Sequence, residues 1–516
     1  MHNGITTSTP SVVRQLYSNM RWNVAAFGCT LISNIVTVPL AVRWIGISEF
    51  GKAGLVMAIC APMMLVGTVL GQALVSPKSA RLGAGDCDAA RRITDASVRL
   101  CFCASLAAWV ALEYAGPWVG TTITGGTLTV EILRPAFLIC AGSMFLRQQV
   151  LIFQSICVAR QSFATLARIS ALAAVFDMTS TACIAAAYPN AEGYLASIAT
   201  GIFLTCATWI YVLRTDLHWR SIALATRSDE IRQLLTFSKW QGATQFFGTA
   251  ANQIDRYLLG ALAPVAFVGQ YNVAGRLAEA AYTASAKGSE VLFPHFGRIS
   301  SHARTEQARH YLTGCWLVAT MGVSIMAPLL PLSGSLLWLW VGPEVGAESG
   351  FLLRTLVLCG MLGITTNVFM QYAMGIGRNK PAAWVSIGYS IATVVFSVIL
   401  LSSYGPRAAG AGMLVASVLR IFAVLHVSKK YYFPHLPHAE LMQPLVLPVS
   451  IAIAASATAR FAGIGETDNW VRLLVDYALI TASVSALIVC ASFFTRSGGE
   501  MALRTIAALR LGLEVK

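Results

Sequence analysis

Long apolar blocks, separated by short polar stretches, run through almost the whole of this sequence. A helix needs about 20 apolar residues to cross the hydrocarbon core of a bilayer, and the blocks reach that length. The pattern therefore predicts about fourteen membrane-spanning helices. The expected spans are 23–43, 54–75, 98–118, 132–157, 163–187, 193–213, 237–262, 266–293, 311–331, 352–375, 382–402, 408–427, 441–462 and 472–494. The stretch 332–341 is expected either to extend the ninth span or to lie at the membrane interface.

The composition supports a protein that lies almost entirely in a membrane. Hydrophobic residues make up 56% of the chain and charged residues only 12%, with a mean hydropathy of +0.65. A soluble domain carries roughly 25% charged residues, so this chain has too little polar surface for a soluble body of its size. We therefore expect an all-α polytopic membrane protein with two parallel six-helix lobes and two further C-terminal helices.

The net charge of +14 is explained by membrane topology once the spans are placed. In a soluble protein such a charge would suggest nucleic-acid binding. Here lysine and arginine concentrate in alternate short loops, which is how membrane proteins mark their cytoplasmic side. The pattern places both termini in the cytoplasm and predicts no nucleic-acid partner. Met1 to Met20 are polar and show no signal peptide.

The polar stretch from Arg214 to Gln233 separates six spans from eight. It predicts an N-terminal lobe at 1–213, a cytoplasmic linker at 214–236, a C-terminal lobe at 237–427, and two additional spans with a cytoplasmic tail at 428–516. Ser228 or Asp229 is expected to cap a helix that leads into the seventh span.

The two halves contain a weak internal echo. Gly46 and Gly51 follow the first span, and Gly260 and Gly269 follow the seventh, each pair in an apolar–glycine, gap, apolar–glycine pattern. We expect both pairs at the outer turns between paired helices, although two tight turns can look alike by chance. Parallel repeats of this kind are common in transporters, which carry the substrate path between the halves.

Two stretches around these turns carry a family resemblance. Asn252-Gln253-Ile254-Asp255-Arg256-Tyr257-Leu258-Leu259-Gly260 and Val268-Gly269-Gln270-Tyr271-Asn272-Val273-Ala274 resemble the seventh and eighth spans of O-antigen and exopolysaccharide flippases. Pro294, Gly46 to Gly51 and Gly375-Ile376-Gly377-Arg378 fit the same pattern. These flippases form the polysaccharide transporter branch of the multidrug/oligosaccharidyl-lipid/polysaccharide exporter superfamily.

The resemblance implies a transporter and not an enzyme. Its members move undecaprenyl-diphosphate-linked oligosaccharides from the cytoplasmic to the outer leaflet of the bacterial inner membrane, by alternating access. They require no cofactor, and a proton or sodium gradient has been implicated in several. The partners that it implies are the lipid-linked oligosaccharide, membrane lipid and polysaccharide assembly proteins, with the protein itself a monomer.

Charged residues inside the spans indicate where such a substrate would bind. An ionised residue at the bilayer centre costs about 2.5–3.5 kcal/mol, so it usually faces a partner or a wet cavity. We expect a basic track for the diphosphate headgroup, formed by Arg147, Arg256, Arg276 and Lys287. Sugar hydroxyls are expected to meet Asn34, Gln245, Asn252 and Gln371.

The same charges allow a purely structural interpretation. Arg276 and Glu279 are three residues apart, as are Lys287 and Glu290, so each pair can form an ion pair on one helix face. Asp255 does not face Arg256 on a helix, so each is expected to have another partner. For ion coupling the candidates are Asp177, which is alone in an apolar stretch, together with Asp255 and Glu279.

Other functions of different classes remain open. A multidrug exporter and a lipid II flippase belong to the same superfamily, although an exporter of cationic drugs would usually present acids. A polysaccharide polymerase or ligase would need a sizeable outer loop, and the outer loops here are short. The cysteines form no Cys-x-x-Cys pair and are expected to be buried apolar residues, with no metal site. The chain has no Walker A loop for ATP.

Overall fold

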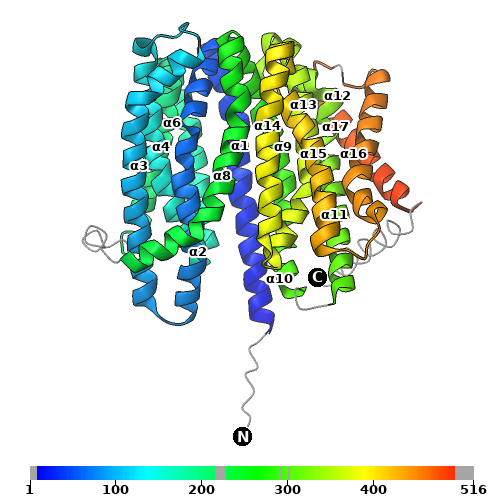
Figure 1. Cartoon of the computed structure of the whole chain (residues 1–516). Helices are drawn as coiled ribbons and strands as arrows, with labels where there is room; N and C mark the ends of the chain where they lie inside the picture. The colour runs from blue at the N-terminus through cyan, green and yellow to red at the C-terminus, as the bar shows by residue number, and fades with distance from the viewer. Residues whose placement is uncertain (1–8, 216–227, 291, 300–302, 466, 494–516) are drawn as a thin grey trace. The chain divides into compact units, whose positions relative to one another are not determined.

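The computed structural model describes residues 9–215, 228–290, 292–299, 303–465 and 467–493. Every regular element among these residues is a helix, which confirms the all-α fold class (Figure 1). Contacts divide the chain into two compact units, Met1–Thr249 and Ala250–Lys516. Residues 216–227 of the predicted linker lie outside the described residues, and the next helix begins at Ser228, as expected.

The first unit is a bundle of long helices that pack side by side. Helix α4 contacts α2, α3 and α6, and α1 contacts α5. The elements are α1 (Thr9–Cys60), η1 (Ala61–Met64), α2 (Leu65–Gly83), α3 (Cys87–Ile123), α4 (Val130–Ala159), α5 (Phe163–Ser180), η2 (Thr181–Ala185), α6 (Ala191–Val212) and most of α8 (Ser228–Leu262).

The second unit begins within α8 and includes the two C-terminal helices. Helix α13 contacts α9, α11 and α12, α14 packs along α15, and α16 and α17 pack on α11. The elements are α9 (Val265–Glu290), α10 (Leu292–Arg298), α11 (Arg304–Met326), α12 (Leu329–Val341), α13 (Pro343–Gly375), α14 (Asn379–Tyr404), η4 (Pro406–Ala408), α15 (Ala411–Val427), η5 (Ser428–Tyr432), α16 (His438–Phe461) and α17 (Trp470–Phe493).

The first two predicted spans lie on either side of a single glycine. Helix α1 contains a kink at Gly46, whose φ of 78° and ψ of 162° are not helical. Residues with a Cβ rarely adopt a positive φ, so glycine suits this position. In the second half the turn lies between Leu262 and Val265, as the expected spans place it, with Gly260 in α8 and Gly269 in α9 on either side. Neither of these glycines has a positive φ, so the two halves turn in different ways.

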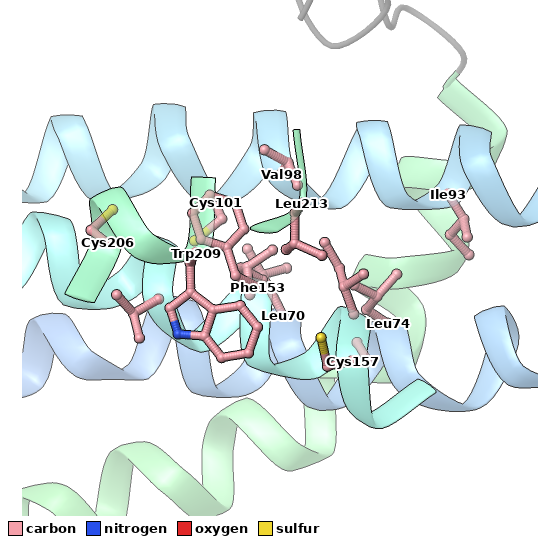
Figure 2. Packing of buried hydrophobic residues seen from close by; sticks show 14 of the residues in the cluster. Leu70, Leu74, Ile93, Val98, Cys101, Phe153, Cys157, Cys206, Trp209 and Leu213 are labelled. Carbon is pink, nitrogen blue, oxygen red and sulfur yellow. The ribbon is translucent and has the colours of Figure 1, made fainter. Parts of the chain in front are cut away.

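An apolar cluster joins α2, α3, α4 and α6 of the first unit (Figure 2). The fully buried Trp209 of α6 lies among the side chains of Leu70, Phe153 and Cys101. Cys157 and Cys206 belong to the same cluster, and all cysteines among the described residues are free thiols. These three cysteines therefore pack as small apolar residues, as their positions in apolar blocks predict.

By length and composition, ten segments of the described chain could cross a membrane. An eleventh is formed by α11 and α12, which are bent by 41° at a short break. One of these segments, Phe27–Ser79, is divided by the kink at Gly46, and α8 and α9 are not among them. The chain is thus a multi-pass membrane protein, and the count of fourteen spans stays a prediction.

The predicted boundaries err mainly where polar residues extend a helix beyond the apolar block. Helix α3 begins at Cys87, well before the expected start of its span at residue 98. Asp86 caps this extension, because its side chain accepts a hydrogen bond from the backbone N–H of Ala89. The stretch 332–341 belongs to α12, a separate helix after the break that ends α11.

Candidate functional site

Three consecutive polar residues near the middle of α4 lie in different environments. Gln148 is fully buried, and its Oε1 accepts a 2.5 Å hydrogen bond from the backbone N–H of Gly67 on α2. Buried Gln149 donates to the hydroxyl of Ser105 on α3 over 2.9 Å. Successive helical residues point about 100° apart. The two glutamines therefore bind neighbouring helices, whereas the side chain of Arg147 is left exposed.

Asp177 on α5 lies within the electrostatic reach of Arg147 on α4. The charge of Arg147 acts on the half-buried carboxylate of Asp177. This carboxylate packs against Gly201 of α6, where an added Cβ would collide with Asp177 Oδ1 and lie 3.3 Å from Ser180 Oγ. The structure thus brings together a predicted headgroup-binding residue and a predicted coupling residue.

The other predicted residues of the first unit do not join this pair. Asn34 is exposed on α1, and Gln245 is half-buried on α8. Within the described part of the chain, neither side chain forms a hydrogen bond or an ion pair. Both amides are therefore available to a ligand, and geometry alone assigns them no common site.

Arg256, near the end of α8, is held entirely by neutral groups. Its Nε donates to Asn272 Oδ1 over 2.5 Å, and its Nη1 donates to Gln253 Oε1 over 2.8 Å and to the backbone carbonyl of Asn252 over 3.0 Å. The guanidinium also lies 5.6 Å from the centre of the Tyr271 ring. Among the described residues no carboxylate forms an ion pair with Arg256, so its orientation is fixed while its charge is not neutralised.

Asp255 faces away from its neighbour and joins three helices. Its Oδ2 accepts hydrogen bonds from Tyr271 Oη on α9 over 2.9 Å and from the backbone N–H of Gly410, just before α15, over 3.0 Å. The residue is 1% exposed, and its Oδ1 has no hydrogen-bond partner. As predicted from their adjacency, Asp255 and Arg256 bind different partners, and Asp255 is buried by the helices that it connects.

Helix α9 carries two more predicted basic residues. Arg276 is half-buried and Glu279 is exposed, and in the described part of the chain neither belongs to an ion pair. The proposed neutralisation of Arg276 by Glu279 is therefore not seen. Lys287 is exposed, and the side chain of Glu290 lies outside the described residues, so the structure does not address their pairing.

Polar residues on α13 and α15 complete the second unit. Gln371 is half-buried, and Asn367, one turn before it, donates to the hydroxyl of buried Ser289 over 2.9 Å. Arg420 lies 5.1 Å from the centre of the Tyr389 ring on α14, and its buried Nε has no hydrogen-bond partner. This cation is thus held by an aromatic face and not by a neighbouring acid.

Two groups of polar contacts were not predicted from the sequence. Lys52 of α1 is buried and lies 2.6 Å from Glu192 of α6 and 3.9 Å from Glu49, whose carboxylate also accepts from the backbone N–H of Ala191. All three charged residues lie between expected membrane spans, which was the available indication. Asn272 lies within the second family stretch, but only the packing of α8 against α9 shows that it binds Arg256.

The two units therefore present different electrostatics. In the first, Arg147 acts on Asp177. In the second, Arg256, Arg276 and Arg420 have no carboxylate within 4.0 Å among the described side chains. Guanidinium groups bind phosphate oxygens through paired hydrogen bonds, so this set suits an anionic ligand. The described residues contain no group of three metal-binding side chains.

Comparison with known sequences identifies one family. The model of the family described as "Polysaccharide biosynthesis protein" matches residues 16–300, more than half of the chain. This range includes α1 to α9 and the Arg147, Asp177 and Arg256 environments. No curated protein matches the chain at a significant level.

Solved structures of transporters share the fold at low sequence identity. "Lipid II flippase MurJ, inward closed conformation" has a TM-score of 0.72 and 14% identity, and the match covers 92% of this chain and 99% of that one. The MATE multidrug transporter DinF-BH, solved in a complex, has a TM-score of 0.63 at 15% identity, covering 84% and 99%. An inward-facing multidrug resistance MATE family transporter of the MOP superfamily gives 0.61 at 14%, covering 79% and 99%.

Proposed function

Because the chain belongs to the polysaccharide biosynthesis protein family, we propose that it is a flippase for undecaprenyl-diphosphate-linked oligosaccharide repeat units. It would carry them across the bacterial inner membrane, by alternating access, for cell-surface or secreted polysaccharide synthesis. The observation that carries this proposal is the environment of Arg256. Neutral acceptors fix its guanidinium, and no carboxylate neutralises it among the described residues.

Each unit holds candidate residues for the headgroup. Arg256, Arg276 and Lys287 would serve in the second unit and Arg147 in the first. A diphosphate needs several donors with an uncompensated positive charge, and arginine provides a planar pair of donors for it. Sugar hydroxyls would meet Asn34, Gln245, Asn252 and Gln371, of which the first two have no protein partner in the described chain.

Ion coupling would depend on Asp177. Its carboxylate is half-buried, and the positive charge of Arg147 favours its ionised form. A phosphate that binds Arg147 would weaken this effect and favour uptake of a proton or sodium ion by Asp177. Asp255 is a poorer candidate for this role, because two donors already occupy its Oδ2. Glu279, which is exposed and outside any ion pair of the described residues, remains a second candidate.

The proposal includes the setting in which the protein works. We place it as a monomer in the inner membrane with both termini in the cytoplasm, in contact with membrane lipid and with polysaccharide assembly proteins. Transport of this kind requires no cofactor beyond an ion gradient and no covalent chemistry.

The deciding experiment measures which leaflet holds the lipid-linked oligosaccharide. Cells that lack the gene should accumulate it on the cytoplasmic leaflet, and the wild-type gene should relieve this. Arg147→Ala and Arg256→Ala should reduce relief by tenfold or more, because each removes a phosphate-binding group. Arg407→Ala, at an exposed turn, is the matched control and should relieve it fully.

Each other outcome has a defined meaning. Full relief by both alanine variants would remove these arginines from the substrate site and leave the flippase proposal intact. No accumulation in cells without the gene would refute the flippase proposal. Accumulation of a lipid-linked peptidoglycan precursor would indicate a lipid II flippase, and lost resistance to cationic drugs would indicate a multidrug exporter.

A further inference from the structure

The break between α11 and α12 removes a helical hydrogen bond at a known place. Helix α11 ends at Met326, α12 begins at Leu329, and the two are bent by 41°. In an uninterrupted helix the carbonyl of Ala327 would accept from the N–H of residue 331. That residue is Pro331, which has no N–H to donate. The carbonyl of Ala327 instead accepts from the backbone N–H of Leu330 over 3.1 Å, in a tighter turn. A break of this kind in the membrane core, where water is scarce, depends on donors from neighbouring helices.

The two C-terminal helices donate to the carbonyls at this break. Ser456 of α16 donates from its Oγ to the carbonyl of Ala327 over 3.1 Å, in a buried position. Tyr477 of α17 donates from its Oη to the carbonyl of Ile325 over 2.6 Å. Both donors come from helices that lie more than a hundred residues later in the sequence. The bend is thus stabilised from outside α11 and α12.

The turn between α16 and α17 holds the other side of the same break. Ser335 of α12 donates to the carbonyl of Gly465 over 2.5 Å and accepts from the backbone N–H of Thr467 over 3.1 Å. Gly465 has a φ of +120°, and a Cβ added there would lie 2.8 Å from the carbonyl oxygen of Pro331. Only glycine lets this turn approach the proline so closely.

A last contact fixes the opposite end of the C-terminal pair. Trp316 of α11 donates from its Nε1 to the hydroxyl of Ser492, near the end of α17, over 2.7 Å in a buried position. The pair therefore contacts α11 before the bend, the bend itself, and α12 after it. Contacts on both arms of a bend fix its angle, whereas contacts on one arm would leave the other free.

From these contacts we infer that the C-terminal pair (α16 and α17) is a brace that sets the angle between α11 and α12. It adds a second hydrogen bond to the carbonyl of Ala327, beside that from Leu330, and holds α12 through Ser335. Because α12 packs along α13, the brace also fixes how that helical pair leaves the bend. This role is independent of the substrate proposed above.

Hydrogen exchange on the full chain in lipid nanodiscs tests the brace. The variant Ser456→Ala/Tyr477→Phe removes both hydroxyl donors and keeps the packing volume nearly unchanged. Peptides that cover Val323–Leu332 should exchange roughly tenfold faster, since two hydrogen bonds that oppose opening are lost. The control is Thr458→Ala/Thr481→Val. These hydroxyls lie on the same two helices but bond only within their own helix, so the bend should exchange as in the wild type.

The outcomes separate the brace from general destabilisation. Equal exchange of the bend in the wild type and in the double variant would overturn the inference. The inference would also fail if the control variant accelerated exchange of the bend as much as the double variant does. If the double variant does not fold, the same exchange measurement is made on the single variant Tyr477→Phe. Faster exchange confined to Val323–Leu332 supports the brace, and unchanged exchange there refutes it. Transport that fails in the Arg256→Ala variant while its bend exchanges normally would show that the two proposals stand separately.

Discussion

At the scale of single residues, neighbours in sequence have opposite roles. Asp255 and Arg256 each bind the residue sixteen positions ahead, Tyr271 and Asn272 respectively, across the short turn that joins α8 to α9. The acid is buried in a network, and the base is left without an acidic partner among the described residues. The distinction follows from the angle of about 100° between successive helical positions.

This geometry predicts how Asp255 responds to substitution. Asp255→Asn keeps one acceptor oxygen for Tyr271 Oη and the N–H of Gly410, so it should cost only about 1 kcal/mol of stability. Asp255→Leu leaves both donors unsatisfied in a buried place and should cost about 2–4 kcal/mol. Thermal unfolding of the purified variants measures the difference.

The same pair of variants separates structure from coupling. If Asp255 acts only through the network, transport driven by an ion gradient should survive in Asp255→Asn and fall in Asp255→Leu in step with stability. A gradient dependence that Asp255→Asn abolishes at unchanged stability would instead make this carboxyl the coupling site.

At the scale of elements, glycines decide how closely helices approach. Gly67 of α2 lies where a Cβ would be 2.5 Å from Gln148 Oε1, and Gly201 of α6 lies where it would collide with Asp177 Oδ1. Each glycine therefore makes room for a polar side chain from the facing helix. A hydropathy pattern contains no trace of this, since glycine is common throughout membrane helices.

Gly201→Ala tests the contact between α5 and α6. The added methyl group must displace the carboxylate of Asp177 or separate the helices, which should cost about 1–3 kcal/mol and reduce transport. Gly388→Ala is the matched control, because α14 has open space there, and it should leave thermal stability unchanged or slightly raised. Equal stability of both variants would show that Asp177 moves freely and is not seated against Gly201.

At the scale of the whole molecule, the two units differ in the surroundings of their arginines. In the first unit the charge of Arg147 acts on Asp177, whereas in the second Arg256, Arg276 and Arg420 form no ion pair with a described carboxylate. If both contribute to one substrate cycle, an anionic lipid should stabilise the native state of the entire chain. Ligands that bind only the folded state raise its stability by about 2.7 kcal/mol at a hundred times their Kd.

Undecaprenyl diphosphate should therefore raise the unfolding temperature of the purified protein. The monophosphate should raise it less, because it offers fewer oxygens to the guanidinium groups, and the rise should shrink in Arg256→Ala. Thermal unfolding in detergent with each lipid measures this. An equal rise with both lipids would show that the isoprenoid chain alone binds, and would remove the diphosphate from the proposed headgroup site.

The sequence by itself determined the fold class, most helix locations and the family. Backbone groups in a bilayer must be satisfied within helices or barrels, so apolar blocks of sufficient length leave little choice. It also predicted that Asp255 and Arg256 would have different partners, since helical geometry is local. The family stretch around Arg256 could be recognised because it is continuous in the chain.

Only the tertiary structure decided which partners those residues have. The action of the Arg147 charge on Asp177, the hydrogen bond from Gly410 to Asp255, and the donation of Ser456 to Ala327 all join residues far apart in sequence. Such contacts depend on the rotation and depth of each helix against its neighbours. Packing sets these, and a pattern of apolar residues along one chain does not contain them.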